Sequence, residues 1–128
     1  MSETPLINLD DYRRLAEEKL SRSAFDYYAS GAHDQVTLNR NRKAFEELSL
    51  YYKVLVDVSR REFSTSLFGR DISLPVVVAP TAFHGLSDPE GEVATARAAA
   101  RAGTIMTLST LSNMPMEKVA EAAATVKQ

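Results

Sequence analysis

The first fifty residues place apolar side chains at the spacing of amphipathic helices. Residues 8–20, NLDDYRRLAEEKL, predict one such helix. Asn8 is suited to cap its N-terminus, and Asp11 completes the spacing of a capping box. One face of this helix is expected to carry four apolar side chains: Leu9, Tyr12, Ala16 and Leu20.

Two further helices are expected before residue 50. Ser21 or Ser23 can cap the second helix, and Gly31 is its expected C-terminal stop. Thr37 can cap the third helix. The apolar positions of these two helices are Phe25, Tyr27, Tyr28, Leu38, Phe45 and Leu48.

The pattern changes from helical to extended at residue 51. Residues 51–58, YYKVLVDV, are rich in aromatic and β-branched side chains, which favour a strand. Residues 62–75, EFSTSLFGRDISLP, predict a β-hairpin whose two short strands join around Gly69 and Arg70.

The most regular pattern begins at residue 74. LPVVVAP, residues 74–80, is a continuous apolar run, which is typical of a strand buried on both faces. A helix is expected from about Pro89 to Ala102, with Asp88 as its N-cap and Gly103 as its stop.

A second unit of the same kind follows at once. TIMTLS, residues 104–109, predicts a buried strand, and Pro115 opens a helix over residues 115–126. Strands and helices that alternate with short connections imply a parallel sheet, either doubly wound or closed as a (β/α)₈ barrel. The loop after the first strand lacks the Gly-x-Gly-x-x-Gly of a dinucleotide site. In a barrel, the active site would form at the C-terminal ends of the strands, residues 79–82 and 108–111.

Two βα units cannot close a barrel, because they leave an open sheet edge and an uncovered apolar face. We therefore expect the sequence to be the front part of a longer protein, or one piece of a split one. The expected divisions are a helical segment over residues 1–50, a strand and hairpin over 51–75, and the first two βα units over 76–128.

Composition narrows the classes of function. The net charge is only −2 and the basic residues are scattered, which argues against nucleic acid or an anionic membrane surface as a partner. Cysteine is absent, so this chain has no thiolate nucleophile, disulfide or cysteine metal ligand. The N-terminus lacks the pattern of a secretory signal, and no apolar stretch approaches about 20 residues. A cytoplasmic protein is the expectation.

Two long motifs resemble a known family. FDYYASGAHDQVTLNRNRKAF and LPVVVAPTAFHGLSDPEGEVATARAAARAGTIMTLST, residues 25–45 and 74–110, are similar to the N-terminal third of the FMN-dependent α-hydroxy-acid oxidases and dehydrogenases. The resemblance implies an α/β fold, a (β/α)₈ TIM barrel that holds FMN at its C-terminal mouth behind a helical N-terminal segment. It implies oxidation of a small 2-hydroxy acid, lactate-like or glycolate-like, to the 2-keto acid. The flavin would then be reoxidised by oxygen or another acceptor.

The resemblance assigns a role to the tyrosine pair. Neighbouring residues on a helix point about 100° apart, so the two rings are expected to face different surfaces. Such a pair is more often packing than chemistry. By resemblance, however, Tyr27 would hydrogen-bond the substrate carboxylate, whereas Tyr28 would belong to the core.

The resemblance also places residues around the cofactor. Ser109 would hydrogen-bond the flavin ring, and Leu111 and Phe83 would form pocket wall. Some glycolate-oxidising members have tryptophan where this chain has Leu111, so a smaller side chain here favours lactate or a larger acid. Four residues at the end of the first strand would lie along the flavin: Ala79, Pro80, Thr81 and Ala82.

No catalytic residue is expected in this chain. By resemblance, the base histidine, the arginine that binds the carboxylate and the lysine that steadies reduced flavin would come after Gln128. The complete protein would be a homotetramer, and this chain alone would be inactive. A metal site is not expected, because His33 and His84 lack a ligand spacing.

The remaining polar residues have simpler interpretations. His33 is expected in a solvated turn, and His84 lies in the first active-site loop without being the family's base. Asp88, Glu90 and Glu92 are interpreted as a helix cap and first-turn charges.

Two other functions stay open. One is a different FMN barrel enzyme, such as a flavin-dependent isomerase, which would have no use for a tyrosine that binds a carboxylate. The other is a non-catalytic assembly module.

Overall fold

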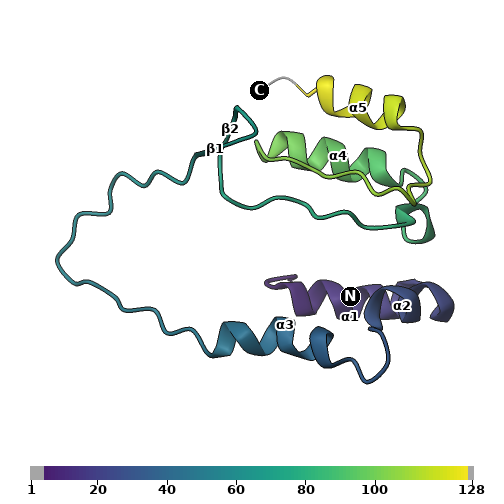
Figure 1. The fold of residues 1–128 in the computed structure, drawn as a ribbon, viewed down its shortest axis with the longest axis horizontal. Helices are drawn as coiled ribbons and strands as arrows, with labels where there is room; N and C mark the ends of the chain where they lie inside the picture. Colours follow the sequence, from purple (N-terminus) through teal and green to yellow (C-terminus); the bar gives the residue numbers. More distant parts are fainter. Residues whose placement is uncertain (1–4, 127–128) are drawn as a thin grey trace. The chain divides into compact units, whose positions relative to one another are not determined.

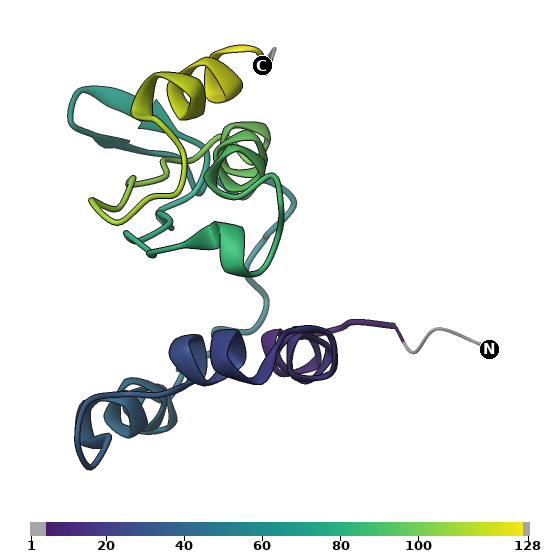
Figure 2. The ribbon, with the colours of Figure 1, turned by 90° about the vertical axis from the view of Figure 1, so that its right-hand side faces the viewer.

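The computed structural model describes residues 5–126, which form two compact units that divide after Val56. The first unit contains three helices, α1 (Leu9–Lys19), α2 (Arg22–Ala29) and α3 (Val36–Glu46). The second contains a hairpin, β1 (Thr65–Leu67) and β2 (Arg70–Ile72), a 3₁₀ turn η1 (His84–Leu86), and helices α4 (Glu92–Arg101) and α5 (Met116–Ala124). Figure 1 and Figure 2 show these elements along the chain.

The predicted capping box of α1 is confirmed. The amide of Asp11 donates to Asn8 Oδ1 at 3.0 Å, and the amide of Asn8 donates back to Asp11 Oδ2 at 3.1 Å. The first amides of a helix lack a carbonyl partner four residues earlier, so this exchange serves two donors at the helix end, and the Asp11 amide also donates to Asn8 O at 3.2 Å.

The caps of the next two helices differ in part from the prediction. Ser21 caps α2, as predicted, by accepting the amide hydrogen of Ala24. However, α2 already ends at Ala29, because Ser30 turns to an extended conformation before Gly31. Thr37 does not cap α3. That helix begins at Val36, two residues before the start that a Thr37 cap implies, after Gln35 takes a left-handed conformation (φ 58°) without a side-chain cap.

A bidentate ion pair joins α1 to α3. Arg42 donates from two nitrogens to the two carboxylate oxygens of Asp10, each at 2.9 Å. This pairing holds the pKa of Asp10 below its ordinary value, chiefly through the hydrogen bonds and then through the charge of Arg42.

The strand predicted over residues 51–58 is absent, and these residues form no regular element. A strand needs a neighbour for its backbone groups, and among the described residues none pairs with this segment. The predicted hairpin is confirmed, with Thr65 opposite Ile72. Its turn lies at Phe68 and Gly69, both with positive φ, which suits the twist of a tight hairpin.

The two apolar runs pair in parallel, as predicted, but the first run is less buried than predicted. Val78 and Met106 form a parallel bridge, in which the amide of Val78 donates to Ile105 O and that of Thr107 to Val78 O, each at 2.9 Å. Among the described residues, this bridge is the extent of strand pairing between the two runs, and Val76 is 60% exposed. The first run is therefore not buried on both faces within the described chain.

Helix α4 starts later than predicted. Asp88 closes a separate turn, in which its Oδ1 accepts the amide of Glu90 at 2.7 Å and its carbonyl accepts that of Gly91 at 2.9 Å. Gly91 then adopts φ 54° and ψ −136°, a conformation that interrupts a helix. The first helical residue is consequently Glu92, and neither Asp88 nor Pro89 opens the helix.

The end of α4 agrees with the prediction. Gly103 has φ 68°, and its amide donates to Ala100 O while that of Thr104 donates to Ala99 O, both at 3.0 Å. This pair of bonds is a Schellman motif, which favours glycine at the left-handed position.

Helices α4 and α5 lie side by side and form the core of the second unit (Figures 1 and 2). The alanines of α4 allow the close approach. No helix among residues 5–126 is long and apolar enough to span a bilayer. The buried core consists of Val93, Ala96 and Val119, with Met106, Leu108, Met114, Ala122 and Ala123 packed against it.

Candidate functional site

The parallel bridge sets the geometry of the candidate site. Because Val78 and Met106 run in the same direction, residues 79–82 and 108–111 leave the paired segments at the same end. The amide of Phe83 donates to the carbonyl oxygen of Leu111 at 3.1 Å, which joins the two turns beyond the bridge. The structure therefore brings the predicted strand-end residues together.

Two hydroxyl groups of the predicted site have local partners. Thr81 Oγ1 donates to Ala79 O at 3.3 Å, and Ser109 Oγ accepts the amide hydrogen of Leu111 at 3.1 Å. Since the Ser109 hydroxyl accepts in this bond, its own hydrogen stays available for another acceptor. The hydroxyl of Thr81 likewise keeps its capacity to accept.

The residues at this end fit a flat cofactor. Among the described residues, the amides of Ala79, Thr81 and Ala82 donate no hydrogen bond, and the side chains here are small. Small side chains allow the backbone to approach a ring closely, and open amides are suitable donors for its polar atoms. The predicted FMN role of these residues is chemically consistent with this backbone.

Behind these turns lies a buried carboxylate that sequence reasoning missed. Glu92, the first residue of α4, is 0% exposed. Its Oε1 accepts the amide of His84 at 3.2 Å and that of Asn113 at 3.0 Å, so one oxygen bridges both turns. The side chain of Asn113 adds a link, because its Oδ1 accepts the amide of Gly85 at 2.9 Å.

The pKa of Glu92 reflects two opposing effects. Burial alone would raise it, because removal from water disfavours the charged form. The amides of Asn113, Glu92 itself and His84, together with the nearby His84 ring, outweigh burial and hold the pKa below its ordinary value. Glu92 is therefore an ionised acceptor inside the second unit. The prediction treated it as a first-turn charge, which describes its place on the helix but not its contacts.

The two histidines occupy different environments. His33 is exposed and has a left-handed backbone (φ 49°), in agreement with the predicted solvated turn. His84 is half-buried, and its Nδ1 lies 3.0 Å from Thr95 Oγ1, so the ring packs against α4. No group of three or more metal-ligating side chains occurs within residues 5–126.

The tyrosine pair belongs to α2 in the first unit. The two rings contact each other edge to face, with centroids 5.4 Å apart and planes at 71°. Tyr27 is 49% exposed and Tyr28 is half-buried. Within the described chain Tyr28 is not a fully buried core residue, and the expectation that the two rings serve separate surfaces stays a prediction. The contact of Tyr27 with a substrate stays a prediction.

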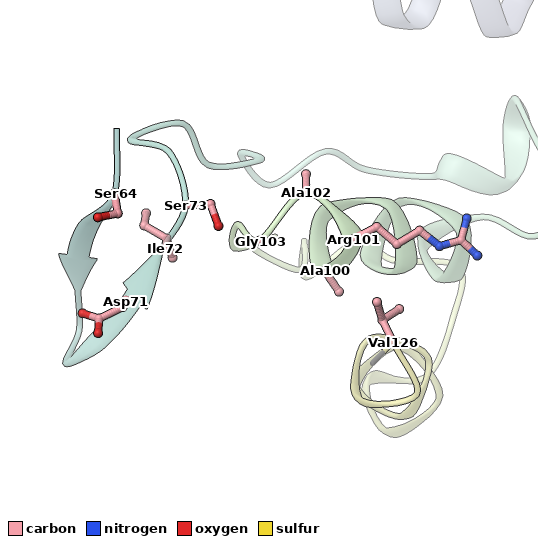
Figure 3. Close-up of a pocket in the computed structure, with 9 residues that line it drawn as sticks. All are labelled: Ser64, Asp71, Ile72, Ser73, Ala100, Arg101, Ala102, Gly103 and Val126. Carbon is pink, nitrogen blue, oxygen red and sulfur yellow. The ribbon is translucent and has the colours of Figure 1, made fainter. Parts of the chain in front are cut away.

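A separate pocket lies at the opposite end of the paired segments (Figure 3). It has a volume of about 470 Å³ and is open between the hairpin and the end of α4. Ser73 and Gly103, which line it, precede the bridge in both segments, and the Ser73 amide donates to Gly103 O at 2.8 Å. In parallel barrels this end supports stability, whereas the other end binds ligands.

Comparison with curated proteins gives close relatives. The chain is 53% identical over 115 residues to an L-lactate oxidase from Nostoc sp., which covers 90% of this chain and 32% of that protein. It is 48% identical over 118 residues to glycolate oxidase 3 from Oryza sativa subsp. indica, with coverage of 92% and 32%. The chain thus spans about a third of the length of these relatives.

Solved structures agree with the fold. A soluble mutant of the membrane-associated (S)-mandelate dehydrogenase from Pseudomonas putida matches with a TM-score of 0.86 and 40% identity, over 91% of this chain and 34% of that one. A lactate oxidase from Pediococcus acidilactici matches with a TM-score of 0.87 and 34% identity, over 95% of this chain and 34% of that one. These matches confirm the predicted class, an α/β chain that corresponds to part of a (β/α)₈ barrel.

The relatives do not share one location. One is named a peroxisomal (S)-2-hydroxyacid oxidase, and the mandelate dehydrogenase is described as membrane-associated. Cytoplasmic localisation and a tetramer therefore stay predictions for this chain.

A family model described as FMN-dependent dehydrogenase matches residues 16–128, which is most of the chain. The resemblance drawn from the two motifs is thereby confirmed, and with it the FMN cofactor of the family. The chain belongs to the FMN-dependent dehydrogenase family.

Proposed function

We propose that this chain supplies part of the FMN site and part of the substrate pocket of an enzyme that oxidises a small 2-hydroxy acid to the 2-keto acid. The observation that carries the proposal is the shared end of the two paired segments. There, residues 79–82 present small side chains and open amides, and Thr81 and Ser109 present hydroxyl groups. The similarity to proteins named glycolate oxidase and L-lactate oxidase supports the substrate class.

FMN, when bound, would accept the two electrons that leave the substrate. The backbone of Ala79 to Ala82 would support the ring, and the Ser109 hydroxyl would donate to one of its acceptors. Tyr27 would donate its phenolic hydrogen to the substrate carboxylate, which fixes the position of the α-carbon. The proposal assigns the catalytic base, the carboxylate-binding arginine and the flavin-contacting lysine to residues outside these 128.

The proposal also concerns substrate size. Phe83 and Leu111 are joined by a backbone hydrogen bond, and Leu111 is 53% exposed in the described chain. A leucine wall leaves more room than tryptophan, so we propose lactate or a longer 2-hydroxy acid in preference to glycolate.

The decisive experiment completes the barrel. The chain is purified alone and together with the part of the Nostoc L-lactate oxidase that it does not match. The visible spectrum is then recorded before and after anaerobic addition of L-lactate. We expect a yellow complex in the combined preparation, and we expect L-lactate to bleach it.

The controls separate the alternatives. The Nostoc portion without this chain should bind no flavin, which shows that residues 1–128 are required. A yellow complex that no 2-hydroxy acid bleaches would favour a different FMN enzyme. Failure to bind flavin in any preparation would contradict the proposal and leave an assembly role.

A further inference from the structure

Both turns of the candidate site are tied to one buried side chain. Glu92 Oε1 accepts the amides of His84 and Asn113, which lie 29 positions apart in the sequence (113 − 84 = 29). A carboxylate that accepts backbone N–H groups makes charge-assisted hydrogen bonds, which are stronger than neutral ones. Because the side chain is fully buried, water does not compete for these bonds.

Two further hydrogen bonds join the turn after the first strand to the turn after the second. Phe83 donates to Leu111 O at 3.1 Å, and Gly85 donates to Asn113 Oδ1 at 2.9 Å. Phe83 also holds a left-handed conformation (φ 56°), which is unfavourable for a residue with a Cβ and is kept only where surrounding bonds fix it. Glu92 accepts the amide that immediately follows this residue.

We propose that Glu92 is a positioning residue of the FMN site, whose buried carboxylate fixes the spacing between the turn after the first strand and the turn after the second. The inference rests on the proposed function, because the groups so spaced are those assigned to FMN. Glu92 does not contact the cofactor in this proposal; it acts through the backbone of His84 and Asn113. It does not extend to Glu90, which is exposed and pairs with Arg97 at 3.2 Å.

The test measures FMN affinity in the combined preparation by quenching of flavin fluorescence. Glu92→Leu removes the acceptor and keeps the volume apolar, so FMN should bind about tenfold more weakly, as expected for the loss of a charge-assisted bond. Glu92→Gln keeps an acceptor oxygen and should stay within about twofold of the parent. Glu90→Gln, two residues away, is the matched control and should equal the parent.

A second variant covers the case in which Glu92→Leu does not fold. Glu92→Asp keeps the charge but withdraws the oxygen by one methylene, so it should bind FMN more weakly than Glu92→Gln. The flavin absorption band should also change shape in the leucine and aspartate variants, at temperatures where circular dichroism shows them folded. A merely structural role would leave this band unchanged.

The outcomes separate the two proposals. Parent-like FMN affinity and spectrum in both Glu92→Leu and Glu92→Asp would overturn the positioning role, as would a glutamine variant as weak as the leucine variant. If the parent binds no FMN, the proposed function fails instead. The positioning role of Glu92 is then tested without cofactor, by amide hydrogen exchange. Exchange in residues 83–86 and 111–114 should be about tenfold faster in Glu92→Leu than in Glu90→Gln. Equal exchange rates in the two variants would overturn the positioning role.

Discussion

The amide of Phe83 donates a hydrogen bond to the carbonyl oxygen of Leu111 at 3.1 Å, so the two residues proposed as pocket wall are joined through their backbones. They belong to the two turns that follow the segments paired at Val78 and Met106. A change of side chain at either residue therefore alters the pocket without removing the bond that joins the turns.

The first prediction follows from this bond. Leu111→Trp should narrow the pocket of the completed enzyme and lower kcat/KM for L-lactate by about tenfold relative to glycolate, in the range that a change of pocket volume gives. Steady-state rates with both acids measure the ratio. Leu111→Met, which is similar in volume, is the control. An unchanged ratio in the tryptophan variant would remove Leu111 from the wall.

The second prediction concerns Tyr27. Tyr27→Phe deletes one hydroxyl, and in the completed enzyme it should lower kcat/KM about ten- to a hundredfold, because a hydrogen bond to a carboxylate is lost. FMN content should stay as in the parent, and the edge-to-face contact with Tyr28 is kept because it needs only the ring. Parent-like kinetics would refute the carboxylate role.

The neighbouring residue, Tyr28, gives a prediction about stability. Tyr28 is half-buried, so Tyr28→Ala should cost less than the roughly 3–5 kcal/mol that is typical of a fully buried aromatic. Urea unfolding of the chain followed by circular dichroism measures this loss.

The third prediction compares two glycines that both have positive φ. Gly69→Ala meets no atom within 4 Å of its new Cβ, so it should cost only the conformational term of about 1–2 kcal/mol. Gly103→Ala carries the same term, but its Cβ would overlap Ser73 Oγ and lie 3.0 Å from Ser73 Cβ. It should cost about 1–3 kcal/mol more, as overpacking does. Equal losses in urea unfolding would show that Ser73 moves aside freely.

The fourth prediction is a pH dependence of α1. The amides of Ile7 and Asn8 hold the pKa of Asp11 below its ordinary value of 3.8, and Arg42 does the same for Asp10. A folded chain with a lowered pKa binds fewer protons than the unfolded chain, so stability rises with pH in this range. The contribution is present above pH 3.8 and is lost as the pH falls through the lowered pKa.

Circular dichroism of the first unit's helices between about pH 7 and about pH 2 measures this loss. Asp11→Asn should reduce the acid-induced change, because its side chain no longer titrates. High salt should weaken the Asp10–Arg42 part, since both groups are exposed. A parent-like acid transition in the Asp11→Asn variant would show that the capping box contributes nothing to it.

Local signals in the sequence predicted most of the second unit. Gly103 correctly predicted the end of α4. The sequence also predicted the Phe68–Gly69 turn within one residue, because tight turns depend on local backbone chemistry. The order of strands and helices, and the ends at which Thr81 and Ser109 lie, followed from the same periodicity. The grouping of these residues is observed, whereas their contact with FMN stays a prediction.

The predictions that were wrong or incomplete concern features that depend on partners distant in the sequence or on turn geometry. Residues 51–58 have strand propensity, but a strand requires a neighbour that propensity cannot supply. Glu92 looked like a first-turn charge, because its sequence position gives no sign that Asn113 would bond to it. The helix at Asp88 was predicted too early, since a capping residue also closes a simple turn.

The hydrogen bonds that Glu92 and Asn113 accept from the two turns also limit how this protein can be re-engineered. The turns 83–86 and 111–114 share the acceptor Glu92 on α4, and Asn113 accepts from Gly85, so replacing one turn with a loop from another enzyme would disturb hydrogen bonds that also hold the other. Substitutions in the two turns should consequently be non-additive, and a working loop graft must exchange both turns together with residue 92.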